Sequence, residues 1–285
     1  MPAPAFNVRS MTDNIGDLDG ALGLSQAVGW PYRRDDWNLA LSLGHGLLGQ
    51  QGDDIVGSAL WWTYGATLAT CGIIIVSPDR QGLGLGRTLM RGMMDAIGDR
   101  TALLNSTLEG RRLYESIGFS EIGTVHQHQA QTLPDAFQNA AIKNAPVRRA
   151  TPGDLPDILQ MDQDAFGAER TRLIEMFSLV GVGAVMERDG VIQGFALCRR
   201  FGHGHAIGPV IARTADDAKA LIRYFLAMKA GEFLRIDVTG DSGLGDWLAA
   251  LGLPEVGDVT TMIRGQAPHL TGQGRIFALA SQSFG

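Results

Sequence analysis

The sequence predicts a mixed α/β protein of the α+β kind, with two similar domains in tandem, each a mostly antiparallel sheet flanked by helices. The chain of 285 residues exceeds the usual size of one domain. Two segments about 140 residues apart, beginning NVRSMTDNIGDLDGALG and PVRRATPGDLPDILQ, open with the same strand, turn and helix pattern. The order of the later strands and helices also matches between the halves, which favours helices packed on an antiparallel sheet.

In the first half, a short strand, a Thr/Asp turn and an amphipathic helix come first, and apolar periodicity predicts the rest. We expect a helix around Trp37–Leu43, strands near Gly46–Gln50, Ile55–Trp62 and Leu68–Val76, a helix from about Gly84 to Ile97, a strand at Ala102–Asn105, a helix at Gly110–Ile117 and a last strand at Glu121–Gln127. The longest helix carries Leu85, Leu89, Met93 and Ile97 on one face, so it packs against the sheet.

In the second half, the segment VMERDGVIQGFALCRR predicts a hairpin with its turn at Asp189-Gly190. A strand at Ala206–Ile211, a helix at Asp216–Lys229, a strand at Leu234–Val238, a helix at Leu244–Leu251 and a strand at Val259–Arg264 follow. The polar, proline-bracketed segment between the halves reads as a linker. We therefore place one domain at residues 1–130, the linker at 131–146 and a second domain at 147–285. The tail RIFALASQSFG has strand-like character, and its role is open.

The composition excludes several classes of function. Hydrophobic residues make up 45% of the chain and charged residues 19%, with a net charge of −6 and no concentrated basic cluster, which argues against nucleic acid as a partner. The first residues do not resemble a signal peptide, and no apolar run approaches the ~18 residues of a membrane span, so we expect a cytoplasmic protein without a membrane partner. Cys71 and Cys198 are expected to be buried free thiols, and no metal site is predicted.

The stretch GIIIVSPDRQGLGLGRTLM, which begins at Gly72, carries the main functional signal. Pro78 ends a buried strand, and glycines at 82, 84 and 86 stand where the loop enters the following helix. The first N–H groups of a helix have no internal partner and carry partial positive charge. A loop without Cβ atoms lets an anion approach these groups, which predicts a pyrophosphate site.

Side chains near the loop can add contacts: Thr88 offers a hydroxyl, and Arg87 or Arg80 a charge-assisted hydrogen bond. Two common phosphate motifs do not fit. A Walker loop needs a lysine that is absent, and the dinucleotide fingerprint needs glycine where the chain has Arg87 or Leu89. A nicotinamide or flavin enzyme is therefore disfavoured. A tight turn alone would need one glycine, whereas the chain has three in five positions.

The stretch VSPDRQGLGLGRTLM resembles the acyl-CoA-binding motif of the GCN5-related N-acetyltransferase (GNAT) superfamily, Gln/Arg-x-x-Gly-x-Gly/Ala, which falls here on Gln81, Gly84 and Gly86. Downstream, LNSTLEGRRLYESIGF resembles the family's second signature, Leu-Tyr-x-x-x-Gly-Phe. The resemblance covers residues 6 to about 130. It implies that the first domain is the catalytic GNAT domain, in an arrangement similar to bacterial two-domain acetyltransferases.

The resemblance also implies roles for single residues. The pyrophosphate of acetyl-CoA, the cosubstrate, would bind the loop residues Gln81, Gly82, Leu83, Gly84, Leu85, Gly86, Arg87 and Thr88. The backbone of Ile74 and Val76 would pair with the pantetheine arm, because an unpaired strand edge accepts it as an extra strand. Thr107 stands where relatives often carry an asparagine, which leaves a hydroxyl for that contact. Tyr114 matches the general acid that protonates the leaving thiolate, although packing in the core is its alternative role.

The base for the reaction is not assigned by the sequence. An amine with a pKa near ~10.4 costs roughly 4.6 kcal/mol to deprotonate at pH 7. Relatives often place a glutamate on the strand before the motif, but TYGATLATCGIIIV contains no acid. We expect ordered water as the base, with His45 or His126 as alternatives. The Val76 amide is a candidate to polarise the thioester carbonyl.

Aromatic residues suggest where an acceptor could bind. Alternation along a strand sends Trp62 and Tyr64 to one face and Trp61 to the other. One face must be core, and the other either lines an acceptor pocket or is core as well. The segment GWPYRRDDW at residues 29–37 lies in the loop that usually shapes acceptor specificity in this superfamily.

The second half lacks the glycine motif after Val210, and Trp247 stands near the position of the signature tyrosine. We therefore expect a degenerate GNAT-like domain that does not hold CoA. It would take the place of a dimer partner, cover a sheet edge and wall the acceptor pocket with FGHGHAIGP.

Together these features predict an N-acetyltransferase that moves an acetyl group directly from acetyl-CoA to a primary amine of a small-molecule acceptor, as a monomer or homodimer and without a metal. The alternative is a non-catalytic acyl-CoA-binding sensor or interaction protein, favoured by the missing carboxylate. The identity of the acceptor and the length of the acyl chain remain open.

Overall fold

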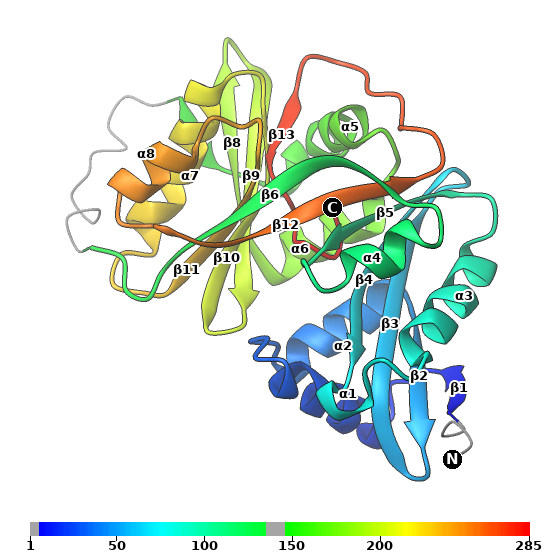
Figure 1. The fold of residues 1–285 in the computed structure, drawn as a ribbon. Coiled ribbons are helices and arrows are strands. Elements are labelled where there is room, and N and C mark those ends of the chain that lie inside the picture. The colour runs from blue at the N-terminus through cyan, green and yellow to red at the C-terminus, as the bar shows by residue number, and fades with distance from the viewer. Residues whose placement is uncertain (1–5, 135–145) are drawn as a thin grey trace.

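The computed structural model describes residues 6–134 and 146–285, and both halves contribute strands to one sheet with helices on its faces (Figure 1). The first half contains β1 (Asn7–Ser10), α1 (Ile15–Ala27), α2 (Arg34–Leu43), β2 (His45–Gln51), β3 (Asp54–Tyr64), β4 (Leu68–Val76), α3 (Leu85–Ile97), β5 (Thr101–Ser106), α4 (Arg111–Glu115) and β6 (Ser120–Ala130). The second half contains β7 (Val147–Arg149), α5 (Leu155–Phe166), α6 (Thr171–Val180), β8 (Gly181–Arg188), β9 (Val191–Phe201), β10 (Gly204–Ala212), α7 (Ala215–Met228), β11 (Leu234–Thr239), α8 (Gly245–Ala250), β12 (Glu255–Arg264) and then β13 (Arg275–Ala278).

Both halves repeat the same order of elements, as the similar openings predict. In the described chain, the strands follow the order β1-β2-β3-β4-β5-β12-β6-β11-β13-β10-β9-β8-β7. The pairs β4–β5 and β10–β11 are parallel, and the other neighbours are antiparallel. The predicted fold class is confirmed. Most of the expected linker, residues 135–145, lies outside the described residues.

The two halves exchange their last strands, which the sequence did not predict. Strand β12 of the second half pairs with β5 of the first half, and β6 of the first half pairs with β11 of the second. The exchanged strands also pair with each other, and Figure 1 shows them crossing the middle of the molecule. Neither half is therefore a separate unit. The edge of β5 that faces away from β4 is covered by β12 of the second half.

Helices cover both faces of the first-half strands. On one face, α3 buries Leu85, Leu89, Met93 and Ile97, the four residues whose spacing predicted its apolar face. On the other face, α1 and α2 pack on a core that continues into the second half. This core joins Trp37 and Trp62 of the first half to Phe177 and Phe195 of the second and to Phe284 of the tail.

The aromatic run on β3 is core on both of its faces. Trp61 lies under α3, whereas Trp62 and Tyr64 lie in the core that joins the halves, so the predicted alternation holds. The Trp62 indole donates to the Ala40 carbonyl at 2.8 Å, and the Tyr64 hydroxyl donates to the Phe284 carbonyl at 3.0 Å. These rings stabilise the fold and do not line the cavity described below.

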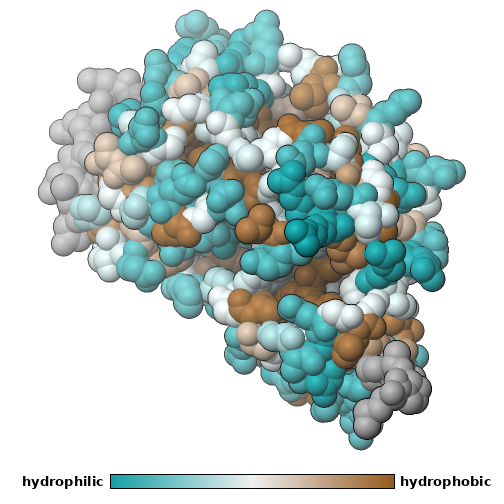
Figure 2. All heavy atoms as spheres, in the orientation of Figure 1, coloured by the Kyte–Doolittle hydropathy of each residue, from teal (hydrophilic) through white to brown (hydrophobic). Residues whose placement is uncertain are grey.

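The tail docks back onto the fold: β13 inserts between β10 and β11, and the turn after it ends between the two halves (Figure 1). The cysteines are free and buried, and burial raises the pKa of Cys71 and Cys198 to about 12. Figure 2 shows a mainly hydrophilic face, with apolar residues gathered in the hollow where the lobe of β1–β3 meets the rest. Among the described helices, none is long and apolar enough to cross a bilayer.

Candidate active site

A gap opens in the first half because β4 and β5 pair only at their first residues. The parallel pairing runs from Leu68 opposite Thr101 to Cys71 opposite Leu104. Further along, β4 pairs with β3 on its other side, while β5 pairs with β12. Within residues 6–134 and 146–285, no strand pairs with the β5-facing edge of residues 72–76. Backbone groups on that edge therefore have no partner in a neighbouring strand.

A bulge in β4 lies at the start of this gap. The register between β3 and β4 shifts after the pair Ser58–Ile75, and Ile73 has a φ of 51°. A left-handed φ is rare for a β-branched residue and is held here by its surroundings. The Ser58 hydroxyl donates to the Ile73 carbonyl at 2.9 Å. Bulges bend a strand and re-aim the residues that follow.

Beyond the bulge, two predicted residues turn their backbone groups into the gap. The Ser77 amide donates to Val56 of β3 at 2.9 Å. Since backbone groups alternate in direction along a strand, those of Ile74 and Val76 point away from β3. The Gln81 side chain donates to the Val76 carbonyl at 3.2 Å from that side.

The loop before α3 needs glycine at two positions because of its backbone. Gly82 has a φ of 75° and Gly84 a φ of 89°, and a Cβ at either position would meet no other atom within 4 Å. Gly84 is the N-cap of α3, no side chain caps the helix, and its first turn contains no acidic residue. The first amides of α3 therefore have no side-chain cap, and their partial positive charge is uncompensated, which fits a phosphate group.

Gly86, which the sequence predicts to bind CoA, also has a packing role. A Cβ at Gly86 would lie 3.3 Å from the Leu113 side chain, so this glycine permits close packing of α3 against α4. Leu85 is buried and Leu83 is exposed, which leaves their backbone amides as the groups that face a ligand. The Thr88 hydroxyl donates to the Gly84 carbonyl at 3.2 Å.

The arginines of the loop lie on either side of the helix start. The Arg80 guanidinium donates to Gln51 at 2.6 Å and pairs with Asp79, whereas Arg87 contacts Ser116 at 3.4 Å. Arg87 is exposed and has no ion pair within the described chain, so its charge is available to a phosphate.

Tyr114 lies on α4 beside the point where β4 and β5 diverge. Its side chain is buried, its ring packs edge-on against Phe119, and its environment includes Cys71, the last residue of β4 that pairs with β5. Burial raises the pKa of Tyr114 well above its usual value, with the nearby Cys71 as a smaller cause. The hydroxyl therefore stays protonated at neutral pH, and the raised pKa makes it a weaker acid than an exposed tyrosine.

A cavity of about 210 Å³ lies between the two halves, and its lining includes residues at the start of the gap. The first half contributes residues 29–32 before α2, Gly72 and Ile73 of β4, and Asn105 and Thr107 at the end of β5. The second half contributes β9, β10 and β11, including three residues of the segment FGHGHAIGP: Phe201, Ala206 and Ile207. The tail turn 279–283 completes the wall, with Ser283 packed against Gly72.

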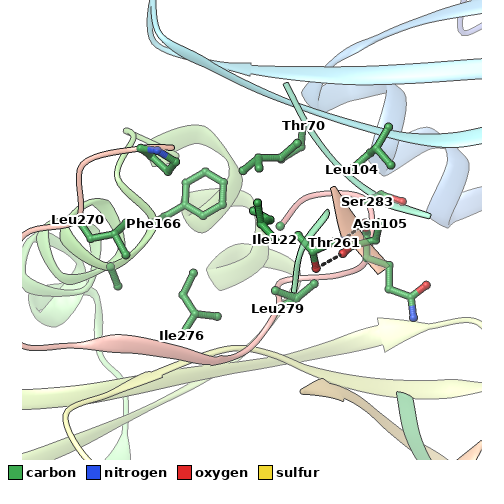
Figure 3. A pocket seen from close by; sticks show the side chains of 15 residues that line it. Thr70, Leu104, Asn105, Ile122, Phe166, Thr261, Leu270, Ile276, Leu279 and Ser283 are labelled. Carbon is green, nitrogen blue, oxygen red and sulfur yellow. Dashed lines mark hydrogen bonds between the residues drawn. The ribbon is translucent and has the colours of Figure 1, made fainter. Parts of the chain in front are cut away.

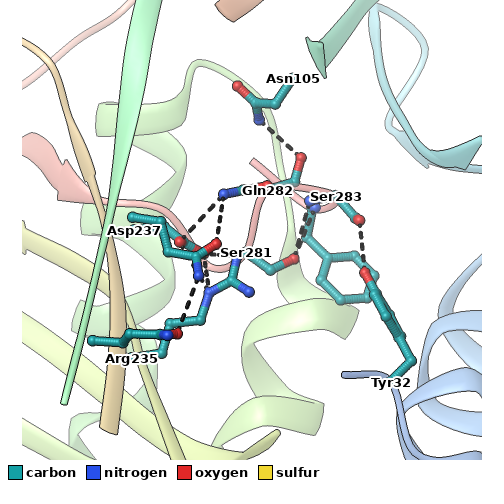
Figure 4. A network of polar contacts seen from close by, with 10 residues as sticks. Tyr32, Asn105, Arg235, Asp237, Ser281, Gln282 and Ser283 are labelled. Atoms are coloured by element: carbon teal, nitrogen blue, oxygen red, sulfur yellow. Dashed lines mark hydrogen bonds and ion pairs between the residues drawn. The ribbon is translucent and has the colours of Figure 1, made fainter. Parts of the chain in front are cut away.

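Polar contacts join β11, the tail and β5 at the wall of this cavity (Figure 4). Arg235 and Asp237 form an ion pair at 3.0 Å on β11. The Gln282 side chain donates to Asp237 at 3.4 Å, and the Gln282 carbonyl accepts from Asn105 at 2.8 Å. The tail is thus held against both halves at the cavity.

A second cavity, of about 190 Å³, is almost wholly apolar (Figure 3). It shares Asn105 and the tail with the first cavity and is otherwise lined by side chains such as Phe166, Leu270 and Ile276. It contains no charged side chain, so it offers space but no acid–base chemistry.

The two histidines considered as bases lie outside the cavity between the halves. His45 is exposed at the start of β2 beside the Trp61 ring, and the Nδ1 of His126 lies 3.0 Å from Glu255. Asp237 is the only carboxylate among the lining residues. The sequence signal for it was a charged residue inside the apolar strand LRIDV, and the same signal marks Arg199 in ALCRRF. Among the described residues, no group of three or more His, Cys, Asp or Glu side chains could hold a metal ion.

The equivalent region of the second half is closed. Strand β13 pairs with both β10 and β11, so it fills the gap that follows their parallel pairing. At the start of α7, the Thr214 side chain accepts from the Asp217 amide, and Asp216 and Asp217 lie in the first turn. A helix start that is capped and negatively charged does not attract an anion.

The fold, the gap between β4 and β5 and the glycine loop agree with the resemblance to the GNAT superfamily. Family models described as acetyltransferase (GNAT) domains match residues 43–121 and residues 158–278. The chain belongs to the GNAT superfamily, a family of acetyltransferases, as a member with two GNAT domains.

Full-length relatives support this assignment. The chain is 29% identical over 275 residues to the uncharacterized N-acetyltransferase YitH of Bacillus subtilis, covering 94% of this chain and 95% of YitH. An acetyltransferase candidate from Pyrococcus horikoshii has a TM-score of 0.80 at 19% identity, with 98% of this chain and 96% of that chain covered. A tandem GNAT protein from the clavulanic acid biosynthesis pathway has a TM-score of 0.63 at 13% identity, with coverage of 91% and 98%. At these identities the two structures share the fold alone.

Proposed function

We propose that this chain is an N-acetyltransferase that moves an acetyl group from acetyl-CoA to the primary amine of a small acceptor, with its donor site in the first half. The observation that carries the proposal is the gap along β4, which leads to the uncapped, glycine-lined start of α3. A free strand edge and a free helix start are the two surfaces that a pantetheine arm and a pyrophosphate need.

In this proposal, the amides between Gln81 and Thr88 bind the pyrophosphate, and Arg87 adds charge. The backbone of Ile74 and Val76 pairs with the pantetheine arm, and Thr107 lies at the far side of the gap. When bound, acetyl-CoA supplies an acetyl group activated as a thioester. The second half holds no CoA and walls the acceptor cavity.

Two side chains carry the proton transfers. Tyr114 keeps its proton at neutral pH and lies beside the gap, so its hydroxyl is the group that protonates the leaving sulfur. Asp237 is the only carboxylate that lines the cavity, and the amine proton passes to it or to a water that it orients. The cavity is smaller than the roughly 300–1,000 Å³ of sites for drug-sized ligands, which favours a small acceptor.

The test is turnover by a matched pair of variants, Tyr114→Phe and Trp247→Phe, the latter at the corresponding position of the second half. Release of thiol from acetyl-CoA is measured with a panel of primary amines. We expect kcat to fall about 100-fold in Tyr114→Phe, the lower end of a general-acid contribution, and to stay unchanged in Trp247→Phe. CoA affinity should be the same in both.

The alternative is a protein that binds acyl-CoA without turning it over, favoured by the absence of an acidic residue on β4. Tight CoA binding with no amine-dependent release of thiol, together with no effect of Tyr114→Phe, would support that alternative and contradict the enzyme.

A further inference from the structure

One buried charge in the cavity between the halves has no partner. Arg199 lies in the apolar strand β9, and only 3% of its surface is exposed. Its guanidinium stacks over the ring of Phe177, with 4.4 Å between Cζ and the ring centroid. Its Nη1 donates to the Arg200 carbonyl at 3.1 Å, while its buried Nε has no hydrogen-bond partner. Within the part of the chain that the structure describes, no carboxylate forms an ion pair with it.

Two other arginines of the described residues that are buried or largely buried are paired. Arg170, which is fully buried, forms an ion pair with Asp162 at 2.7 Å, and Arg235 pairs with Asp237 at 3.0 Å. Burying a charge without a counter-charge is costly, and proteins usually avoid it. An unpaired, buried guanidinium that lines a cavity therefore indicates a missing anion.

The acids near Arg199 are already engaged. Asp36 accepts two hydrogen bonds from the Arg33 guanidinium and one from the Gly202 amide, and Asp237 is held by Arg235. Burial lowers the pKa of Arg199 to about 10, so it remains protonated at neutral pH. Among the described residues, the cavity wall thus carries one uncompensated positive charge.

The same cavity reaches the reaction site. Arg199 lines it together with Gly72 and Ile73, which lie at the start of the gap along β4. Resting on the proposed function, we infer that the acceptor is a small amine that also carries a carboxylate, bound by Arg199 while its amine lies near Ile73. A single unbalanced positive charge suits a monoanion, and the planar guanidinium suits the two oxygens of a carboxylate.

The experiment uses pairs of probes that differ only in this charge. Glycine, β-alanine, 4-aminobutyrate and α-amino acids with small side chains are each compared with their primary amides, and phosphoethanolamine serves as the probe for a phosphate instead. The readout is kcat/KM for release of thiol from acetyl-CoA. We expect one or more of the acids to react at least about 100-fold better than its amide, the size expected for a buried charge pair.

Variants then assign the preference to Arg199. Arg199→Met should reduce kcat/KM for the preferred acid about 100-fold and leave its amide within about three-fold. Arg199→Lys should restore part of the preference. Arg200→Met, which changes the exposed neighbour, is the matched control. The melting temperature of Arg199→Met should equal or exceed that of the wild type, because an unpaired buried charge is removed.

Equal rates for acids and amides, equal loss of both in Arg199→Met, a lower melting temperature of that variant, or preference for phosphoethanolamine would overturn the inference while leaving the proposed function in place. The inference also fails if CoA binds but no carboxylate-bearing amine of the panel reacts. Absence of CoA binding, measured separately by calorimetry, overturns the proposed function itself and the inference with it.

Discussion

Both halves of this chain contain a pair of parallel strands that diverge, but the gap between the strands is open in the first half and filled in the second. In the first half, the edge of β4 beyond Cys71 is open and leads to a helix start without a cap. In the second half, β13 occupies the gap between β10 and β11, and Thr214 caps the helix that follows. One fold therefore leaves an open strand edge and helix start in one copy, where we propose the donor site, and a gap filled by a strand in the other.

The comparison shows how the second half is built without the glycine motif. From the missing glycine motif after Val210, the sequence predicted that the second half does not hold CoA. In the structure, the gap is filled by the protein's own strand and the helix start is neutralised by its own acids. In the second half, strand β13 satisfies backbone groups of β10 and β11, whereas in the first half we propose that the pantetheine arm pairs with the corresponding edge of β4.

The largest change in stability is expected when the packing of β13, which fills the gap between β10 and β11, is weakened. Phe277 of β13 is fully buried, so Phe277→Ala should lower the free energy of unfolding by about 3–5 kcal/mol. Denaturation in urea measures this change. Leu270→Ala, at an exposed position of the same tail, is the control. A loss below 1 kcal/mol would mean that β13 does not hold the second gap closed.

A substitution at the uncapped start of α3 should weaken the binding of CoA. Gly84→Val places a β-branched residue at a φ of 89°, so we expect the Kd for CoA to rise about 100-fold. Gly190→Val, at a φ of 75° in the hairpin turn between β8 and β9, is the matched control and should leave the Kd unchanged. Calorimetry gives both values and the number of sites. An unchanged Kd for CoA in Gly84→Val would contradict a donor site at the start of α3 in the first half.

A smaller effect is shared by both halves, because each opens with the same ion pair. Asp17 accepts from Arg9 and Thr12, and Asp154 accepts from Arg148 and Thr151. Hydrogen bonds from these arginines, which offset the opposing effect of burial, hold the pKa of both carboxyls well below their usual range. Each should therefore stabilise the fold fully above about pH 4 and lose its effect as the pH falls below that value.

Asp17→Asn and Asp154→Asn should each lower stability at pH 7 by about 1–2 kcal/mol, a modest value because Arg9 and Arg148 are partly exposed. The difference from the wild type should shrink as the pH falls from 4 toward 2. Asp216→Asn, at a highly exposed carboxylate, is the control. A difference that stays constant down to pH 2 would show that the ion pairs are not its cause.

The sequence predicted local structure well because local structure depends on nearby residues. The bounds of β4 and the apolar face of α3 follow from composition and spacing, and the duplicated opening follows from its Val-Arg and Thr/Asp pattern. Helix α6 was missed, since residues 171–180 lie between a helix and a strand of similar apolar content. The residues proposed to bind CoA came from motifs, and their role remains a prediction.

The sequence could not predict which distant strands pair with each other in the sheet. Alternation along β6 and β12 sets which face of each strand is buried, but it does not say which strand lies beside it. Strand β11, which pairs with the exchanged strand β6, contributes Asp237 and Arg235 to the wall of the cavity between the halves. Charged residues such as Arg199 inside apolar strands were visible in the sequence, yet only the fold shows that they meet.

Amide hydrogen exchange with and without CoA tests the donor site most directly. We predict that CoA slows exchange at residues 74–88, across the edge of β4 and the start of α3, and leaves residues 204–217 of the second half unchanged. Protection at the start of α7, or none at residues 74–88 when CoA is bound, would contradict a donor site in the open gap of the first half.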